Sequence, residues 1–251
     1  MKFFKSGFFR NFAGIVTGLA LIVIMFVTAF EIACYSDYGF YEKEYRKYDV
    51  NNENSIVNME MDELMRVTKE MMSYLRGNRE DLVIYAIIDG TEKEMFNSID
   101  KSHMADVREL FVNALALRWI CIFLLLISVL LLFLTNGVKK GLAAVCSCVQ
   151  YCIGVLWAVL AAVIVMACVN FTAVFYAMHK LLFDNDNWLL DPEISRLINI
   201  LPEGFFVDMG IRIAIIFIFI NVIIFSLSFI IKRGIIGKKS KKISGGTYEQ
   251  G

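Results

Sequence analysis

Hydrophobic residues are concentrated in four long runs of this 251-residue chain. The runs cover about residues 12–33, 117–134, 152–176 and 211–231. Each is long enough for a helix to cross a bilayer core of about 30 Å, which takes about 20 helical residues. No run alternates between apolar and polar residues with a period of two, as a strand of a closed barrel would. The pattern therefore predicts an all-α membrane protein with a four-transmembrane-helix bundle.

Two polar segments lie outside these runs, at about residues 35–115 and 181–209. In the first segment, apolar residues recur at intervals of three and four between residues 59 and 75, which predicts a helix. Residues 82–88 form a short strand-like run that ends at an Asp-Gly turn. Because this segment is small for an independent domain, we expect a small mixed cap on the bundle. Residues 1–251 would then form a single membrane domain.

The pattern also predicts features of the second and third long helices. The helix that leads into the second run is expected to begin with Ser98, Asp100 or Ser102 as its N-cap. Arg118 lies inside the second run, so its charged end must face the bundle interior or extend to the membrane surface. The third run is expected to continue as a helix through Asn170 to His179.

The distribution of lysine and arginine gives the chain an orientation. The two termini and the turn between the second and third runs hold 11 of the 25 basic residues but one of the 25 acidic residues. The positive-inside rule places these three segments in the cytoplasm. It predicts a multi-pass protein of the cell membrane with N-in/C-in topology and an extracytoplasmic cap. We assign the basic tail to orientation and to attraction for anionic membrane lipid, and we expect no nucleic-acid partner.

Several kinds of site have no support in the sequence. The six cysteines lie in or at the ends of hydrophobic runs, which predicts apolar packing rather than disulfides. The chain lacks a phosphate-binding loop, an H-E-x-x-H motif and a G-x-S-x-G elbow. We therefore expect neither a metal nor a cofactor.

The two histidines of the chain, His103 and His179, border the second and third runs. Gly141, in the turn between these runs, is midway between the two in sequence. If both helices are continuous, each histidine rises roughly 55 Å from that turn at about 1.5 Å per residue. Both are then expected just outside the outer headgroups or within them, where they can face each other. Asp106 lies on the same helical face as His103 and can orient its ring or raise its pKa, or it is a solvated helix charge.

Three classes of function fit these features. A facing histidine pair suits an enzyme that moves protons at the outer face, although a single histidine at an interface is often only an amphipathic residue. A metal-dependent hydrolase would use both histidines with Asp186 or Asp191, but no spacing supports that site. A non-enzymatic membrane protein would bind a partner through the acidic first segment. A transporter fits less well, because no span is visibly broken.

Two motifs carry a resemblance to a known family. The first is SHMADV, residues 102–107, which precedes a transmembrane helix. The second starts at His179 and continues with F-x-x-D-x-W-L-L-D-P at residues 183–192 and L-P-E-x-F-F-x-D at residues 201–208. With four helices and two outer segments, the chain resembles the lipoprotein intramolecular transacylase (Lit) family of Gram-positive bacteria. The resemblance covers nearly the whole chain and is weakest in the acidic segment between residues 35 and 97.

The resemblance implies an acyltransferase that acts on diacylglyceryl-modified lipoproteins. In this family the sn-2 acyl chain moves from the glycerol oxygen to the amine of the N-terminal cysteine, giving the lyso form. Because an ester becomes an amide, no nucleotide is needed. The resemblance implies that His103 and His179 are the catalytic dyad, with the roles of base and acid open and an acyl-histidine intermediate as an alternative. Asp106, Trp188 and Asp191 are supporting candidates, for orienting His103, for shaping the site near His179 or for anchoring the loop.

Overall fold

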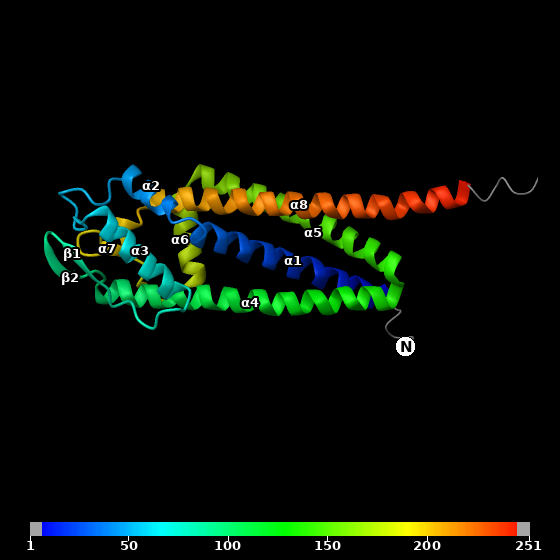
Figure 1. Cartoon of the computed structure of the whole chain (residues 1–251), viewed down its shortest axis with the longest axis horizontal. Coiled ribbons are helices and arrows are strands. Elements are labelled where there is room, and N and C mark those ends of the chain that lie inside the picture. The colour runs from blue at the N-terminus through cyan, green and yellow to red at the C-terminus, as the bar shows by residue number, and fades with distance from the viewer. Residues whose placement is uncertain (1–6, 245–251) are drawn as a thin grey trace, which may run out of the picture. The chain divides into compact units, whose positions relative to one another are not determined.

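The computed structural model describes residues 7–244, and most of them are helical (Figure 1). Four helices are long and apolar enough to cross a membrane: α1 (Gly7–Tyr35), α4 (Ser98–Asn136), α5 (Val138–Val169) and α8 (Glu203–Ser244). The other elements are short: α2 (Gly39–Lys47), α3 (Met61–Leu75), α6 (Phe171–Leu182), α7 (Arg196–Ile200), β1 (Tyr85–Ile88) and β2 (Thr91–Glu94). The predicted four-span helical protein is confirmed, with one small β-hairpin.

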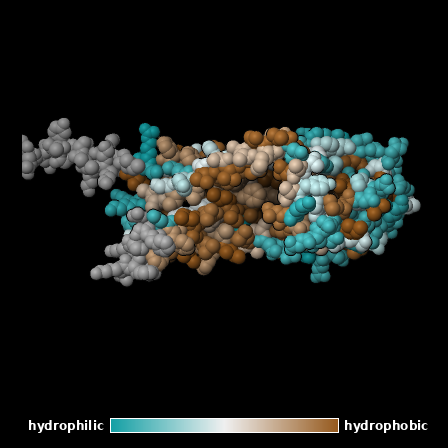
Figure 2. Space-filling view, turned by 180° about the vertical axis from the view of Figure 1, so that it is seen from behind, coloured by the Kyte–Doolittle hydropathy of each residue, from teal (hydrophilic) through white to brown (hydrophobic). Residues whose placement is uncertain are grey.

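The chain forms two compact units. The apolar unit contains, of the described residues, 7–29, 117–163 and 215–244, and the mixed unit contains Phe30–Ala116 and Ile164–Ala214. Each of the four long helices contributes residues to both units. Figure 2 shows apolar side chains over the helices of the apolar unit and many hydrophilic side chains over the mixed unit. That contrast is typical of a helical bundle that faces lipid and a cap that faces water.

The core of the apolar unit joins three of the long helices. It consists of Met25 and Ala29 of α1, Val149 and Ile153 of α5, and Phe217 of α8. Outward-facing leucine, isoleucine and phenylalanine side chains on the same helices remain exposed. Because lipid is as apolar as these side chains, the helices associate through close packing rather than through exclusion of water.

Helices α1 and α5 pack closely at two glycines of α1. A Cβ added at Gly14 would lie 2.5 Å from Sγ of Cys148, and one added at Gly18 would lie 2.0 Å from Sγ of Cys152. The cysteine side chains therefore occupy the space that the glycines leave open. All six cysteines are free, as the sequence predicted. The hydroxyl of Thr17 links α1 to α4 by donating to Oγ of Ser128 at 2.9 Å.

The mixed unit contains the two α-helices and the hairpin that precede α4. Strands β1 and β2 pair antiparallel, with Ile88 opposite Thr91. Positive φ angles at Asp89 and Gly90 give the turn between them, as a tight hairpin requires. Arg66 of α3 donates to the carbonyl oxygen of Tyr85 at 2.5 Å, so α3 covers the free edge of β1. The predicted helix and strand are present, but β2 was not predicted, because its sequence TEKE lacks apolar residues.

The N-cap of α4 differs from the prediction. The residue that caps the helix is Asn97, whose Oδ1 accepts from the backbone N–H groups of Ile99 and Asp100, both at 2.8 Å. Asp100 is fully buried instead, and its carboxylate accepts from the hydroxyl of Ser195 at 2.5 Å and from the N–H of Asn97 at 3.2 Å. Burial raises the pKa of this carboxyl group. Ser195 is also the N-cap of α7, so a single hydroxyl joins α7 to α4.

The third long helix is not continuous to His179, contrary to the prediction. Helix α5 ends at Val169, and the side chain of Asn170 caps a new helix, α6, by accepting from the N–H of Ala173 at 2.9 Å. Within the mixed unit, α6 runs across the direction of the first turns of α4 (Figure 1). Thr172 of α6 donates to Glu203 of α8 at 2.7 Å. An asparagine cap turns the chain here, because its side chain replaces the backbone acceptor that an uninterrupted helix would supply.

The glycine–cysteine packing of the apolar unit predicts a steric effect. We expect Gly18→Ala to destabilise the protein by about 1–3 kcal/mol, because the added methyl group overlaps Sγ of Cys152. Adding Cys152→Gly in the same chain should recover much of the loss. Thermal unfolding in detergent measures both effects. The control is Gly154→Ala, because the space around the Cβ position of Gly154 is open. The packing is misassigned if the Gly18→Ala protein unfolds at the same temperature as the parent. It is also misassigned if Gly154→Ala lowers the unfolding temperature as much as Gly18→Ala does.

The bond between α7 and α4 predicts an effect on the mixed unit. We expect Ser195→Ala to cost about 1–3 kcal/mol of unfolding free energy, because the buried carboxylate of Asp100 loses a donor. Ser195→Thr keeps the hydroxyl and should cost less. Ser98→Ala, at an exposed serine of α4, the helix that carries Asp100, is the matched control. Equal thermal unfolding of the Ser195→Ala and Ser98→Ala proteins would contradict the assignment.

Candidate functional site

The two histidines lie next to each other in the mixed unit. His103 is in the second turn of α4 and His179 is near the end of α6. Their ring centroids are 6.1 Å apart, the ring planes are inclined by 36°, and each residue is 8% exposed. The expectation that they face each other is confirmed, although the break at Asn170 removes the continuous hairpin from which it was argued.

Aromatic side chains surround the histidine pair. Phe175, one turn before His179 on α6, lies against its ring with centroids 4.1 Å apart and ring planes inclined by 45°. Trp188 is buried, and its ring lies 5.0 Å from that of His179. Phe183 contacts both histidines, at 5.2 Å from His103 and 5.7 Å from His179. The aromatic rings remove the imidazoles from water without providing a counter-charge.

This burial determines the charge of the pair at neutral pH. Burial is the larger cause that, together with the neighbouring His179, lowers the pKa of His103 to about 4 against the opposing effect of the Asp106 carboxylate. Burial also lowers the pKa of His179, but the hydrogen bond to the backbone of Phe175 opposes this shift. Both residues lie outside the apolar stretches that cross the membrane, since the apolar part of α4 begins near Leu117. Both imidazoles are therefore neutral at pH 7.

The hydrogen bonds of the two rings differ. Nδ1 of His179 lies 2.8 Å from the carbonyl oxygen of Phe175. Because a carbonyl only accepts, Nδ1 carries the proton and Nε2 presents its lone pair. Nδ1 of His103 is buried and has no hydrogen-bond partner among residues 7–244. An unpaired buried nitrogen is costly, which makes His103 a candidate for hydrogen bonding to a ligand.

Two asparagines hold the segment between α6 and α7 on α4. Their hydrogen-bond partners on α4 lie on either side of His103. Asn185 donates to Oδ2 of Asp106 at 2.9 Å, and Asn187 donates to Oγ of Ser102 at 3.0 Å. Ser102 and Asp106 precede and follow His103 on the helix, so the two bonds fix the segment above it. The sequence analysis missed both asparagines, for which the only signal is their alternation with aspartates at residues 184–187.

The supporting candidates have different positions. Trp188 contacts the ring of His179. Asp106 accepts a hydrogen bond from Asn185, so its carboxylate holds the loop while its charge acts on His103 through space. Asp191 is exposed, and its Oδ1 accepts from the N–H of Glu193 at 2.9 Å, which shapes the turn before α7.

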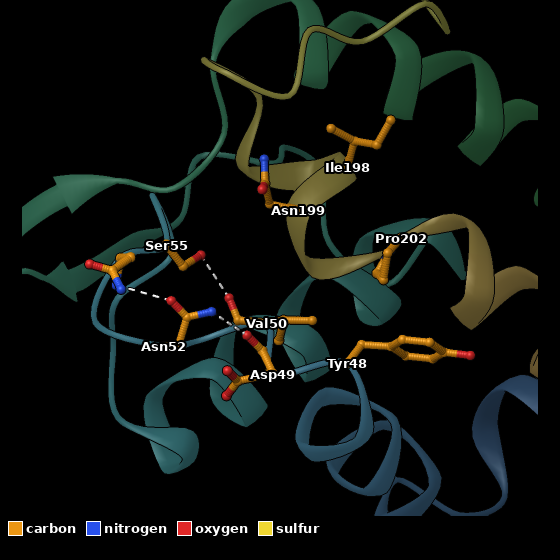
Figure 3. Close-up of a pocket in the computed structure, with 9 residues that line it drawn as sticks. Tyr48, Asp49, Val50, Asn52, Ser55, Ile198, Asn199 and Pro202 are labelled. Atoms are coloured by element: carbon orange, nitrogen blue, oxygen red, sulfur yellow. Dashed lines mark hydrogen bonds between the residues drawn. The ribbon is translucent and has the colours of Figure 1, made fainter.

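Two other features of the mixed unit bear on the chemistry. Within residues 7–244, no three histidine, cysteine, aspartate or glutamate side chains lie close enough to hold a metal ion. A cavity of about 480 Å³ lies between residues 48–55 and the α7 region (Figure 3). Its polar groups largely bond to nearby backbone, as Asn52 does to the carbonyl oxygen of Asp49 and Ser55 to that of Val50. Neither histidine lines this cavity.

Two solved structures have the same fold. One is the in meso structure of the membrane integral lipoprotein intramolecular transacylase Lit from Bacillus cereus, 21% identical, with a TM-score of 0.71 over 94% of this chain and 100% of that chain. The other is a histidine-to-alanine variant of the same protein, 20% identical, with a TM-score of 0.68 over 96% of this chain and 100% of that chain. No curated protein sequence matches the chain significantly.

A match to a protein-family model shows which family the chain belongs to. The model described as lipoprotein intramolecular transacylase Lit matches residues 15–206, which include more than nine-tenths of the residues of the mixed unit and both histidines. The matched region covers most of the chain. The protein therefore belongs to the lipoprotein intramolecular transacylase (Lit) family, and it is an acyltransferase of the membrane.

Proposed function

We propose that the chain moves the sn-2 acyl chain of a diacylglyceryl lipoprotein to the amine of its N-terminal cysteine and releases the lyso form. The observation that carries this proposal is the pair of buried, neutral histidines 6.1 Å apart between centroids. Amine and ester belong to one molecule, so the site needs to position them and to move one proton. Positioning alone can remove about 7–11 kcal/mol of such a barrier.

The reaction balances without a cofactor. The amine nitrogen attacks the ester carbonyl carbon, a C–N bond forms, and the bond from that carbon to the glycerol oxygen breaks. One proton leaves the amine and one proton reaches the glycerol oxygen. An amine with a pKa of about 7.7–8.0 is largely protonated at neutral pH, so a base must act before or during the attack.

We assign the base to His179 and the acid to His103. The bond from Nδ1–H of His179 to the carbonyl oxygen of Phe175 leaves Nε2 free to accept the amine proton, and it stabilises the imidazolium that results. His103 has no such partner, so its neutral ring can direct an N–H group at the departing glycerol oxygen, as a neutral imidazole does when it stabilises a developing oxyanion. After acyl transfer, the proton on His179 restores the one that His103 gave up.

The surrounding residues have positioning roles in this mechanism. Trp188 and Phe175 hold the ring of His179 from two sides. Asp106 and Asn185 hold the loop over His103, and Asp191 shapes the turn that leads to α7. These contacts exclude water, so the acyl group passes to the amine rather than to a hydroxide ion.

We further propose that this site is extracytoplasmic. The basic residues of the termini and of the turn between α4 and α5 support N-in/C-in topology, which places the polar segments of residues 35–115 and 181–209 outside. The whole chain then works as a single membrane domain in the cell membrane, with membrane lipid around its four spans. A substrate whose acyl chains remain in the outer leaflet would reach the histidines from that side.

Histidine replacement tests the function. In a host without other lipoprotein N-acyltransferases, we expect the chain to convert a reporter lipopeptide to the N-acyl, S-monoacylglyceryl form with unchanged total mass. His103→Ala and His179→Ala should each reduce the product by about 100-fold or more, because proton transfer is lost. Tandem mass spectrometry of the N-terminal lipopeptide measures the product.

Lys180→Ala, at an exposed residue beside His179, is the matched control and should form normal product. All variants are compared at equal membrane content. Normal product from either histidine variant would rule out the dyad. A diacylglyceryl peptide left unmodified by the parent chain would rule out the transfer reaction itself.

The histidine pKa values predict the pH profile. The folded pKa of His103 is about 4, below the unfolded value of about 6.5, and that of His179 is also lowered. We expect kcat/KM, which depends on the protonated amine and on a neutral base, to change by less than about twofold between pH 7.5 and 5.5, where the amine is mostly protonated. A histidine titrating at about 6.5 would instead produce a roughly tenfold fall at pH 5.5, which would contradict the neutral pair.

The same shift predicts the sign of the effect on stability. Since the folded pKa lies below the unfolded one, the unfolded chain takes up protons first as the pH falls. The free energy of unfolding should therefore decrease as the pH falls from about 6.5 towards 4 and should not depend on these groups above pH 7.

A further inference from the structure

An acidic groove adjoins the histidine pair in the mixed unit. It has a volume of about 260 Å³ and lies between α4 and the segment that follows α6. It is lined by Asp106, Glu109, Leu110, Asn113, Leu182, Phe183, Asp184 and Asn185. Three of these residues are acidic and none is basic. We call this feature the acidic groove.

The acidic groove is in contact with the proposed catalytic pair. Phe183 lines it and touches the rings of both histidines. Asp106 lines it one helical turn from His103, and its negative charge acts on that imidazole. His103, itself 8% exposed, presents the buried Nδ1 that lacks a partner in the described part of the chain. A ligand in the groove would therefore lie against Phe183 and close to the histidine pair.

The carboxylates of the groove suit an organic cation better than a metal ion. Glu109 and Asp184 are exposed, and no described side chain neutralises either of them. No three acidic or histidine side chains within residues 7–244 converge as a metal site requires. The third carboxylate, Asp106, already accepts a bond from Asn185. Spread along a groove, three carboxylates attract an ammonium group that can hydrogen-bond in several directions.

We infer that the acidic groove binds the primary ammonium group of the substrate, the N-terminal amine of the lipoprotein, and holds it beside the histidines. This inference rests on the proposed function, in which that amine is the nucleophile. An α-amine with a pKa of about 7.7–8.0 arrives mostly protonated at neutral pH. The groove gives this charge a place beside the histidine pair, of which His179 is the proposed proton acceptor.

The groove acts on binding more than on the chemical step. The positive charge stays close to the same carboxylates whether it is on the amine or on the imidazole. Interactions that are equal in the ground state and in the transition state lower KM and leave kcat unchanged. Glu109 and Asp184 are thus specificity-determining residues for a free amine, while the histidines carry the proton transfer.

The test is a binding comparison that needs no turnover. The probe is a lipopeptide whose N-terminal cysteine carries an ether-linked dialkylglyceryl group, which cannot be transacylated, with its amine either free or acetylated. We expect the parent chain in detergent to bind the free-amine form roughly tenfold more tightly at low salt. The double variant Glu109→Gln/Asp184→Asn should lose this preference, since two exposed ion pairs contribute about that much together.

Asp62→Asn/Glu80→Gln, which removes two exposed acids elsewhere in the mixed unit, is the matched control and should keep the preference. Equal binding of the two lipopeptides by the parent chain would overturn the inference. A preference that survives in the double variant would also overturn it.

Competition identifies the source of the amine. Phosphatidylethanolamine and phosphatidylglycerol are added in turn to the free-amine binding assay. Weak competition by both supports the lipoprotein amine as the ligand. Strong competition by phosphatidylethanolamine alone, with no preference between the lipopeptides, would assign the groove to an aminophospholipid and overturn the inference.

Kinetics with an ester-linked substrate separate the inference from the proposed function. We expect the double variant to raise KM roughly tenfold and to change kcat by less than about twofold. Normal product with an unchanged KM would overturn the role of the groove and leave the transacylase proposal intact. No product from the parent chain would overturn the transacylase proposal, and the groove inference with it.

Discussion

The hydrogen bonds between the first turns of α4 and the segment that follows α6 hold the site together. His103 and His179 come from different helices and share no hydrogen bond that would keep them paired. The asparagines at residues 185 and 187 fix the segment on either side of His103, and Ser195 fixes it again through the buried Asp100. The distance between the imidazoles therefore depends on three hydrogen bonds donated by two amides and one hydroxyl, two of which are accepted by carboxylates of α4.

The same segment makes the environment in which the histidines work. It brings Phe183 and Trp188 onto the rings, and this burial keeps both imidazoles neutral. In the proposed reaction, a charged histidine would repel the ammonium group of the substrate, whereas a neutral one can accept its proton. Carboxylates are kept outside the aromatic enclosure, in the acidic groove, where they attract the cation without fixing a proton on His103.

The sequence predicts the parts of this structure that depend on long-range periodicity. Four spans follow from hydrophobic runs, and the two histidines stand out because they are the only ones in the sequence, although their spacing about Gly141 assumed a continuous helix that the break at Asn170 interrupts. Local polar contacts could not be predicted in the same way. Asn170 turns the chain inside an apolar run, where only proline or glycine would have signalled a break. Asn97 caps α4 although Ser98 and Asp100 follow it, because the carboxylate of Asp100 instead accepts the hydrogen bond from Ser195.

The fit between α1 and α5 has a consequence for how the protein is assembled. Synthesis runs from the N-terminus, so α1 enters the membrane well before α5. Until then the surface around Gly14 and Gly18 has no cysteine side chains to fill it, and lipid must occupy that space. The earlier partner is α4, which α1 meets through the hydroxyls of Thr17 and Ser128. This contact is available before α5 is synthesised, and α5 then fills the surface around Gly14 and Gly18 with its cysteine side chains.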